Sequence, residues 1–216
     1  MEKLKTKDGS FTFVSQKFDE PYHSKSGALE EALEKYSNAL LIWEINSPVI
    51  FDFCFGLGYN TLMAVNVLKS KGLTASFVCF ENDVEILKKV LELNIEIGGF
   101  DLLKEFVKGV LEDKFVFEKE GFKFEMVLAD AIVEIEKDLE KKADYVFFDP
   151  FSPKKHPEMW EEKVFKNLNK NMKKEGKLAT YSYAKKTREN LEKAGFKVID
   201  GPIIGRRSPS TIAIKK

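Results

Sequence analysis

The sequence predicts an α/β protein built on an open, mostly parallel sheet with helices on both faces. From residue 48 to residue 200, apolar strand-like runs alternate with helical stretches, the pattern of parallel strands joined by crossover helices. The run 144–149 holds four consecutive apolar residues, which is typical of a strand buried on both faces. The last two runs, 196–201 and 211–216, are joined by GPIIGRRSPS without a helix. That connection is too short for a crossover, so the sheet should end in an antiparallel hairpin.

The elements divide into a small first part and a large second part. Residues 1–45 are expected to form an N-terminal β/α extension, and residues 46–216 a main domain with a seven-stranded sheet. The predicted strand of the extension spans 11–14. The predicted strands of the main sheet span 48–55, 74–80, 144–149, 177–183, 196–201 and 211–216, with a further hairpin over 114–130. The predicted helices span 27–43, 60–72, 83–95, 100–113, 131–142, 157–174 and 184–195.

Local residue choices support several of these boundaries. Pro157 stands near the start of its helix, where the missing backbone N–H has no partner to lose. Gly72 and Gly195 follow the last turns of two other helices, the position at which glycine commonly ends a helix. Around the letters EKEG, apolar residues alternate with period two, which predicts the hairpin over 114–130.

Composition limits the class of protein. The 216 residues and 24.8 kDa fit one domain with a small appendage. No apolar run approaches the roughly 20 residues of a membrane span, and the start MEKLKTKDGSF lacks the apolar region of a secretory signal. A cytoplasmic protein with no membrane partner is therefore expected. Cys54 and Cys79 lie inside apolar strands and are expected to be reduced, and two cysteines with two distant histidines form no zinc pattern.

Charge is balanced overall but unevenly spread along the chain. Residues 1–140 hold 16 Lys and Arg against 26 Asp and Glu, whereas residues 141–216 hold 19 against 9. A basic last part suggests a side that faces a polyanion. The alternative is that lysine and glutamate coat solvated helices without forming a binding face.

A glycine turn follows the first strand of the main domain. A parallel sheet that ends in an antiparallel hairpin is the usual shape of class I S-adenosylmethionine (SAM) methyltransferases. Gly56 and Gly58 lie between that strand and a helix that opens near Asn60, at the edge where ligands of such sheets bind. Together with Glu81, these three residues are expected to hold the methionine and ribose of SAM. Cys54 occupies the place of the first glycine of a dinucleotide fingerprint, so a looser turn, suited to a ligand without phosphate, is expected. The alternative is an ordinary tight turn.

Two acidic residues end neighbouring strands at the same edge. Glu81 comes after the second strand, near the ~20-residue offset at which a carboxylate accepts the ribose hydroxyls of a nucleoside. Capping of the next helix needs only Asn82 or Asp83, which leaves Glu81 for a ligand. Asp130 could meet the adenine amino group, or it could instead be the N-cap of the next helix.

The stretch DPFSP (149–153) suggests methylation of an amine. Asp149 and the carbonyl of Pro150 could accept the N–H bonds of an incoming amine, and Phe151 could stack on a flat base. The carboxylate would also stabilise positive charge that develops on the nitrogen. Its role is orientation and electrostatics, because an ordinary aspartate is a weak base. The structural alternative is a turn that only leads into the next helix.

Two basic clusters lie near this stretch in the predicted fold. Lys154 and Lys155 follow it directly, and Arg206 and Arg207 lie in the loop of the final hairpin. All four could hold phosphates near a substrate base, or be solvated loop charges.

Four stretches together resemble one known family. They are YHSKSGALEEA (22–32), FDFCFGLGYNTL (51–62), DPFSPKKHPEMW (149–160), and LATYSYAKKTRENLEKAGFKV (178–198) followed by GRR. Together they resemble the methyltransferase domain of the MnmC type, the tRNA 5-aminomethyl-(2-thio)uridine methyltransferases. The resemblance runs from about residue 18 to the end, and Pro-Glu-Met-Trp is its most specific part. By the same resemblance, Tyr22, His23 and Ser24 fold over the cofactor.

The resemblance implies SAM as cofactor and the anticodon region of tRNA as partner. The expected reaction is N-methylation of the 5-aminomethyl group on the wobble (2-thio)uridine, which gives 5-methylaminomethyl-(2-thio)uridine. Bacterial two-domain members carry a flavin-dependent domain after this one, and this chain is expected to have methyl transfer only, with no metal and as a monomer. Three alternatives stay open: another amine acceptor on a DNA base or protein, a spermidine-synthase-like aminopropyltransferase, and a non-catalytic SAM- or RNA-binding module.

Overall fold

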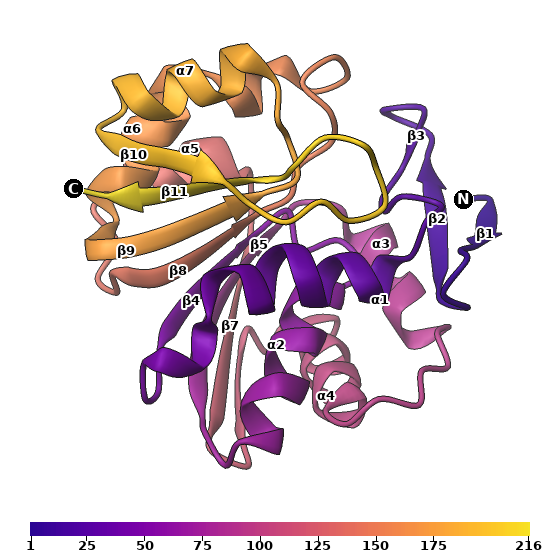
Figure 1. The fold of residues 1–216 in the computed structure, drawn as a ribbon. Coiled ribbons are helices and arrows are strands. Elements are labelled where there is room, and N and C mark those ends of the chain that lie inside the picture. The colour runs from indigo at the N-terminus through magenta and orange to yellow at the C-terminus, as the bar shows by residue number, and fades with distance from the viewer.

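A central sheet of eight strands organises the computed structural model, which describes residues 1–216 (Figure 1). Across the sheet the order is β10-β11-β9-β8-β4-β5-β7-β6. The strands are β4 (Val49–Phe53), β5 (Ala75–Glu81), β6 (Val116–Lys119), β7 (Phe122–Leu128), β8 (Ala143–Phe148), β9 (Met172–Thr180), β10 (Phe196–Asp200) and β11 (Thr211–Lys215). Strands β7, β5, β4, β8 and β9 are parallel, and β11 runs antiparallel between β9 and β10. The predicted α/β fold and its terminal antiparallel hairpin are confirmed.

The eighth strand is the difference from the predicted seven. Strand β6 pairs antiparallel with β7 at the edge of the sheet. The turn between them places Glu120 at φ 53° and Gly121 at φ 79°, and two successive positive φ values are typical of a tight two-residue hairpin turn. The hairpin over 114–130 was predicted, but its first strand also extends the main sheet.

The helices depart most from the predicted boundaries at three places, and α3 also ends four residues earlier than predicted. They are α1 (Ala28–Glu31), η1 (Ala32–Asn38), η2 (Ile42–Glu44), α2 (Tyr59–Ser70), α3 (Val84–Leu91), α4 (Phe100–Val110), α5 (Ala131–Glu136), η3 (Pro157–Trp160), α6 (Glu162–Lys170) and α7 (Lys185–Lys193). The predicted helix 27–43 is α-helical only at its start and continues as the π-helix η1 and the 3-10 helix η2.

Two polar side chains explain the other two departures. The predicted helix 157–174 breaks at the extended Glu161, because the carbonyl of Trp160 accepts a hydrogen bond from Asn190 on α7 (2.8 Å). Helix α5 ends at Glu136 because the side-chain amide of Asn171 donates hydrogen bonds to the carbonyls of Ile135 (3.1 Å) and Lys137 (2.9 Å). Asn171 also ends α6, so β9 starts at residue 172 and not at the predicted 177.

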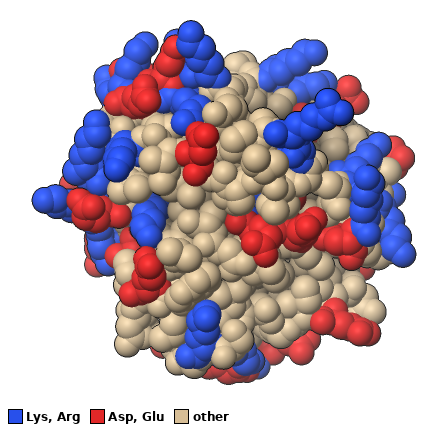
Figure 2. All heavy atoms as spheres, viewed as in Figure 1, with Lys and Arg blue, Asp and Glu red and all other residues tan.

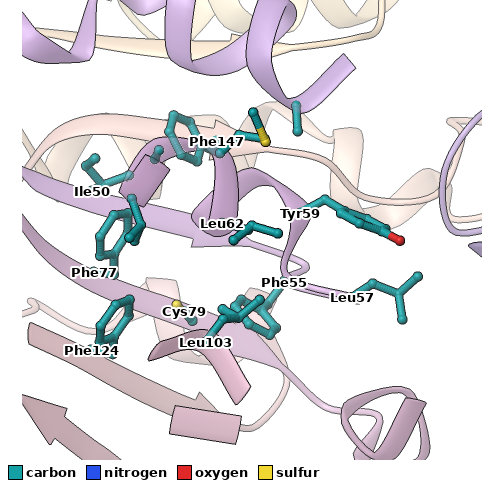
Figure 3. Packing of buried hydrophobic residues seen from close by; sticks show 14 of the residues in the cluster. Ile50, Phe55, Leu57, Tyr59, Leu62, Phe77, Cys79, Leu103, Phe124 and Phe147 are labelled. Atoms are coloured by element: carbon teal, nitrogen blue, oxygen red, sulfur yellow. The ribbon is translucent and has the colours of Figure 1, made fainter. Parts of the chain in front are cut away.

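Each face of the sheet carries its own hydrophobic core. Alternate residues of β4 point to opposite sides, so Ile50 joins one core and Phe51 the other. Figure 3 shows the first core, in which Phe77 and Phe124 stack with ring centroids 5.2 Å apart. Helices η1, α2, α3 and α4 cover this face, and α5, α6 and α7 cover the other (Figure 1). No helix is long and apolar enough to cross a membrane.

The N-terminal extension is a small antiparallel sheet with a helix. Its strands are β1 (Lys3–Lys5), β2 (Phe11–Ser15) and β3 (Glu20–Pro21). The hydroxyl of Tyr59, at the start of α2, donates to the carbonyl of Phe11 (2.6 Å) and ties this sheet to α2. The extension therefore stands beside the carboxyl ends of the parallel strands, whereas the domain boundary at residue 45 stays a prediction.

Candidate active site

Two adjoining cavities open at the carboxyl ends of the parallel strands. The larger has a volume of about 670 Å³ and the smaller about 270 Å³. Four residues line both: Tyr22, His23, Asp149 and Phe151. We call them the first and the second cavity. Asp149 thus lies where two separate compartments meet, as a reaction between two bound molecules requires.

The turn after β4 is left-handed at three residues. Cys54, Gly56 and Gly58 all have positive φ, at 63°, 55° and 73°. Cys54 and Gly56 line the first cavity. Gly58 lines neither cavity: it precedes the first residue of α2, and a Cβ there would lie 2.6 Å from the ring of Phe55. Gly58 therefore allows close packing, and the left-handed turn persists at Cys54 although L-residues rarely adopt it.

Glu81 lies in the first cavity with most of its carboxylate already satisfied. One oxygen, Oε2, accepts the N–H of Gly56 (2.8 Å). The other, Oε1, accepts the N–H groups of Asn82 (2.8 Å) and Asp83 (2.9 Å). Burial raises the pKa of Glu81, and these backbone hydrogen bonds oppose that rise. Of about four acceptor sites on a carboxylate, one on Oε2 is free for a ligand hydroxyl.

Asp83 and Asp130 both cap helices and both line the first cavity. Asp83 accepts the N–H of Glu85 at the start of α3 (2.9 Å) and the hydroxyl of Tyr22 (2.9 Å). Asp130 accepts the N–H of Ile132 at the start of α5 (2.9 Å). The two roles proposed for Asp130 are therefore compatible, because one oxygen caps the helix while the other is free.

Asp149 is held by residues that line the second cavity. Its Oδ2 accepts a hydrogen bond from the Nδ2 of Asn60 (3.0 Å). The hydroxyl of Tyr36 lies beside the carboxylate, outside hydrogen-bonding geometry. Burial, and next the negative charge of Asp149, raise the pKa of Tyr36 well above its usual value. Asn60 lines the second cavity and not the first, so its contact is with Asp149 and not with the proposed methionine moiety.

The residues after Asp149 are fixed by aromatic neighbours. The carbonyl of Pro150 accepts the hydroxyl of Tyr181 (3.0 Å), which leaves one of its lone pairs for a substrate amine. The ring of Phe151 stacks on Phe18, with centroids 4.4 Å apart, and meets Tyr22 edge-on. Phe151 can therefore offer a base at most one face.

Of the four basic residues predicted to bind substrate, one reaches a cavity. Arg206 lines the second cavity and lies over the ring of Tyr181, 5.0 Å from its centroid. Lys154, Lys155 and Arg207 line neither cavity. Lys155 pairs with Asp19 in the N-terminal extension (3.3 Å).

Tyr22, His23 and Ser24 each line at least one of the cavities. Tyr22 and His23 line both, and Ser24 lines the second. Burial lowers the pKa of His23, so its imidazole is neutral at pH 7. Its ring stands edge-on to Tyr59, with centroids 4.9 Å apart.

The sequence interpretation missed several residues that line the cavities. They are Phe18, Glu20, Lys35, Tyr36, Asp83 and Tyr181. Tyr181 directly follows the last residue of β9, so the strand-end argument that found Glu81 would also have found it. Nothing in the sequence points to Tyr36, because its direction depends on the π-helical segment η1.

The first cavity fits SAM. Its volume lies within the ~300–1,000 Å³ usual for small-ligand sites. Ile132, Ala131 and Met159 give it an apolar wall, and Glu81 offers a free acceptor to a ribose hydroxyl. No group of three or more His, Cys, Asp or Glu side chains is placed to hold a metal ion.

A family comparison identifies the class of protein. The profile of a family described as S-adenosyl-L-methionine-dependent methyltransferase matches residues 100–216, more than half of the chain. The chain belongs to this family of methyltransferases. SAM is accordingly its cofactor, and the first cavity is the site whose residues fit it.

Similar proteins narrow the resemblance further. The crystal structure of MnmC2 from Aquifex aeolicus superposes with a TM-score of 0.81 and 31% identity, over 98% of this chain and 69% of that one. The tRNA 5-methylaminomethyl-2-thiouridine biosynthesis bifunctional protein MnmC of Leptospira interrogans is 30% identical over 92% of this chain. An uncharacterized protein of Methanocaldococcus jannaschii is 31% identical over 98%. The chain therefore resembles the MnmC methyltransferase domain.

The chain spans only part of these curated relatives. It covers 59% of the Methanocaldococcus protein and 33% of the Leptospira protein. A more distant structure, precorrin-6y C5,15-methyltransferase from Geobacter metallireducens, has 17% identity and a TM-score of 0.54, which shows the shared fold alone.

Proposed function

We propose that this chain transfers a methyl group from SAM to the 5-aminomethyl group of a wobble uridine in tRNA. The product would be 5-methylaminomethyluridine, with or without a 2-thio group. The observation that carries the proposal is the position of Asp149, which faces both cavities and is held by Asn60. An acceptor amine in the second cavity would meet a fixed carboxylate beside the cofactor compartment.

The residues of the chain would bind and orient the amine. When bound, SAM supplies an electrophilic methyl group: the nitrogen lone pair forms the new N–C bond, the S–C bonding pair stays on sulfur, and the product ammonium releases one proton to water. Asp149 would stabilise the positive charge that develops on nitrogen. The free lone pair of the Pro150 carbonyl can accept an N–H bond. Alignment of the two reactants would supply most of the rate enhancement.

Two observations favour RNA as the substrate. The similar proteins of known name act in the biosynthesis of a modified tRNA nucleoside or are named for the same family. Arg206 is a cation without an ion pair at the edge of the second cavity, and its guanidinium lies over the ring of Tyr181, which leaves its N–H groups for a phosphate.

The test is methyl transfer from labelled SAM to unmodified tRNA and to tRNA that carries 5-aminomethyluridine, followed by nucleoside analysis. We expect label only in the methylaminomethyl nucleoside. Asp149→Ala should abolish turnover and leave the affinity for SAM almost unchanged, with Asp101→Ala on the surface of α4 as control. If neither tRNA is labelled although SAM binds, the tRNA proposal fails, and DNA, protein and polyamine acceptors become the candidates.

The rival functions differ in the charge that the second cavity should have. A spermidine-synthase-like enzyme needs acidic residues around a polycation, and Glu20 and Glu31 do line this cavity. However, the backbone N–H of Ser152 donates to Glu20 (2.9 Å), and Lys35 pairs with Glu31. Because both carboxylates are engaged within the chain, the cavity favours a monoamine over a polyamine. A non-catalytic module predicts no effect of Asp149→Ala on any turnover.

A further inference from the structure

Three unsatisfied polar atoms lie around the second cavity. They are the hydroxyl of Tyr36, the Oδ1 of Asn60 and the Nδ1 of His23, each buried without a hydrogen-bond partner. Tyr36 is 2% exposed and Asn60 4%. Buried polar atoms without partners are rare in proteins and need an explanation. All three residues line the same cavity, so a bound ligand can explain them together.

Two of these atoms adjoin the carboxylate of Asp149. A carboxylate only accepts hydrogen bonds, so the nitrogen of Asn60 must face Asp149 and Oδ1 is the free end of that amide. The hydroxyl of Tyr36 also lies near the Asp149 carboxylate, whose negative charge raises the pKa of Tyr36. Asn60 and Tyr36 line the second cavity but not the first. Three oxygen-bearing groups therefore surround one point at which the cavities meet.

We propose that Asp149, Asn60 and Tyr36 form a three-oxygen receptor that accepts a primary amine and stops the reaction after one methyl transfer. A primary ammonium has three N–H groups for three acceptors. After it loses one proton to water, the amine turns so that its two N–H groups bind two of the oxygens and its lone pair faces the first cavity, from which the methyl group comes. This inference rests on the proposed function, because it takes the amine of that reaction as the ligand.

The same count disfavours a second methylation. The monomethylated product is a secondary amine, which as a free base has one N–H and an added methyl group. With its lone pair toward the first cavity, its methyl would face one of the two oxygens that held N–H groups before, and that buried oxygen would lose its partner. Tyr36 is the residue of the three whose polar atom can be removed alone, because Tyr36→Phe keeps the ring that packs edge-on against Phe147 (centroids 5.7 Å apart).

The test compares two synthetic anticodon stem–loops, one with 5-aminomethyluridine and one with 5-methylaminomethyluridine. Wild-type protein should methylate the first and leave the second almost unchanged. Tyr36→Phe should accept the second and raise the ratio of dimethylated to monomethylated nucleoside about tenfold or more, measured by mass spectrometry. It should also raise the KM for the first, because one acceptor of the amine is gone.

Tyr145→Phe is the matched control. Tyr145 is an equally buried tyrosine on β8 whose hydroxyl lies 3.4 Å from the carbonyl of Leu41, outside both cavities. The Tyr145→Phe variant should leave the ratio of dimethylated to monomethylated nucleoside unchanged. The melting temperature of Tyr36→Phe checks folding, and it should equal or exceed that of the wild type, because an unpartnered hydroxyl contributes no hydrogen bond.

The possible results separate the two proposals. If wild-type protein methylates neither stem–loop, the proposed function fails. If wild type methylates the first stem–loop but Tyr36→Phe shows the wild-type product ratio, the receptor is overturned and the function stands. A wild type that readily forms the dimethylated nucleoside would also overturn the receptor.

Discussion

Asn60 donates the one hydrogen bond that the Asp149 carboxylate receives from a side chain (3.0 Å). Without it, the carboxylate would be free to rotate away from the point where the cavities meet. We expect Asn60→Ala to lower kcat by about 10- to 100-fold, and to leave the Kd for SAM within about twofold because Asn60 does not line the first cavity. Steady-state kinetics and calorimetric titration would measure the two quantities.

The same helix offers the control for Asn60. Asn66 donates to the carbonyl of Gly98 (3.2 Å), far from either cavity. Asn66→Ala should keep the wild-type kcat. A tenfold weaker SAM affinity in Asn60→Ala, with kcat unchanged, would return Asn60 to the cofactor role that the sequence first indicated.

Asp52 is a buried carboxyl on β4 that should make stability depend on pH. It is fully buried, Oδ2 accepts the hydroxyl of Thr61 (2.7 Å), and Oδ1 has no partner. Burial raises its pKa to about 8. The folded chain therefore keeps a proton that the unfolded chain loses near pH 4, so this contribution to stability is complete below pH 4 and is lost as pH rises toward 8.

Asp52→Asn removes that proton equilibrium and nearly keeps the shape. We expect the free energy of unfolding of the variant to rise relative to that of the wild type between pH 5 and pH 8, by up to about 1.4 kcal/mol per pH unit. The melting temperature of the variant should rise relative to the wild type over the same range. Above pH 8 the difference should level off. Asp101→Asn, at an exposed position on α4, should show a constant difference. A constant difference for Asp52→Asn as well would mean that Asp52 is ionised in the folded protein.

At the scale of elements, we expect residues 15–24, called here the cover segment, to close over both cavities. Within this cover segment, Tyr22 donates to Asp83 (2.9 Å) and Phe18 stacks on Phe151. The cover segment contributes lining residues to both cavities. A bound cofactor should therefore hold it closed.

Hydrogen exchange tests the cover segment. S-adenosylhomocysteine at 100 times its Kd should slow exchange of the amides in 15–24 by up to about 100-fold. That is the largest factor possible if these amides exchange only from the ligand-free protein. Strand β6, at the far edge of the sheet, is the internal control and should exchange at an unchanged rate. Equal slowing in both segments would indicate general stabilisation and no closure.

The sequence predicted the elements whose signals are local. Parallel strands end at one edge, so the residue pattern alone places Glu81, Asp130 and Asp149 near one another. The π-helical register that directs Tyr36 could not be predicted, because it depends on packing of η1 against α2 and β9. The break at Glu161 depends on a hydrogen bond from a helix that comes later in the chain, and no local pattern contains that information.

At the scale of the whole molecule, folding mixes the charges that the sequence separates. Basic residues of the last part pair with acidic residues of the first part in Lys141–Glu125, Lys142–Asp138, Lys155–Asp19, Lys163–Glu136 and Lys177–Glu44. Figure 2 shows positive and negative side chains interspersed over one face of the molecule. The expectation of one broad basic side is therefore replaced by a small set of cations without ion pairs near the second cavity: Lys154, Arg206 and Arg207.

This small set predicts a shallow dependence of tRNA binding on salt. Three phosphate contacts at about −0.7 to −0.9 each give a slope of log K against log salt of about −2 to −3. Reversing Arg206 and Arg207 to glutamate should weaken binding and reduce the slope by about two contacts. Reversing Lys163 and Lys166 on α6, which changes net charge equally but removes ion-paired lysines, should have a much smaller effect. A slope steeper than about −5, or equal losses in both double variants, would mean that the RNA contacts a far wider surface than the rim of the second cavity.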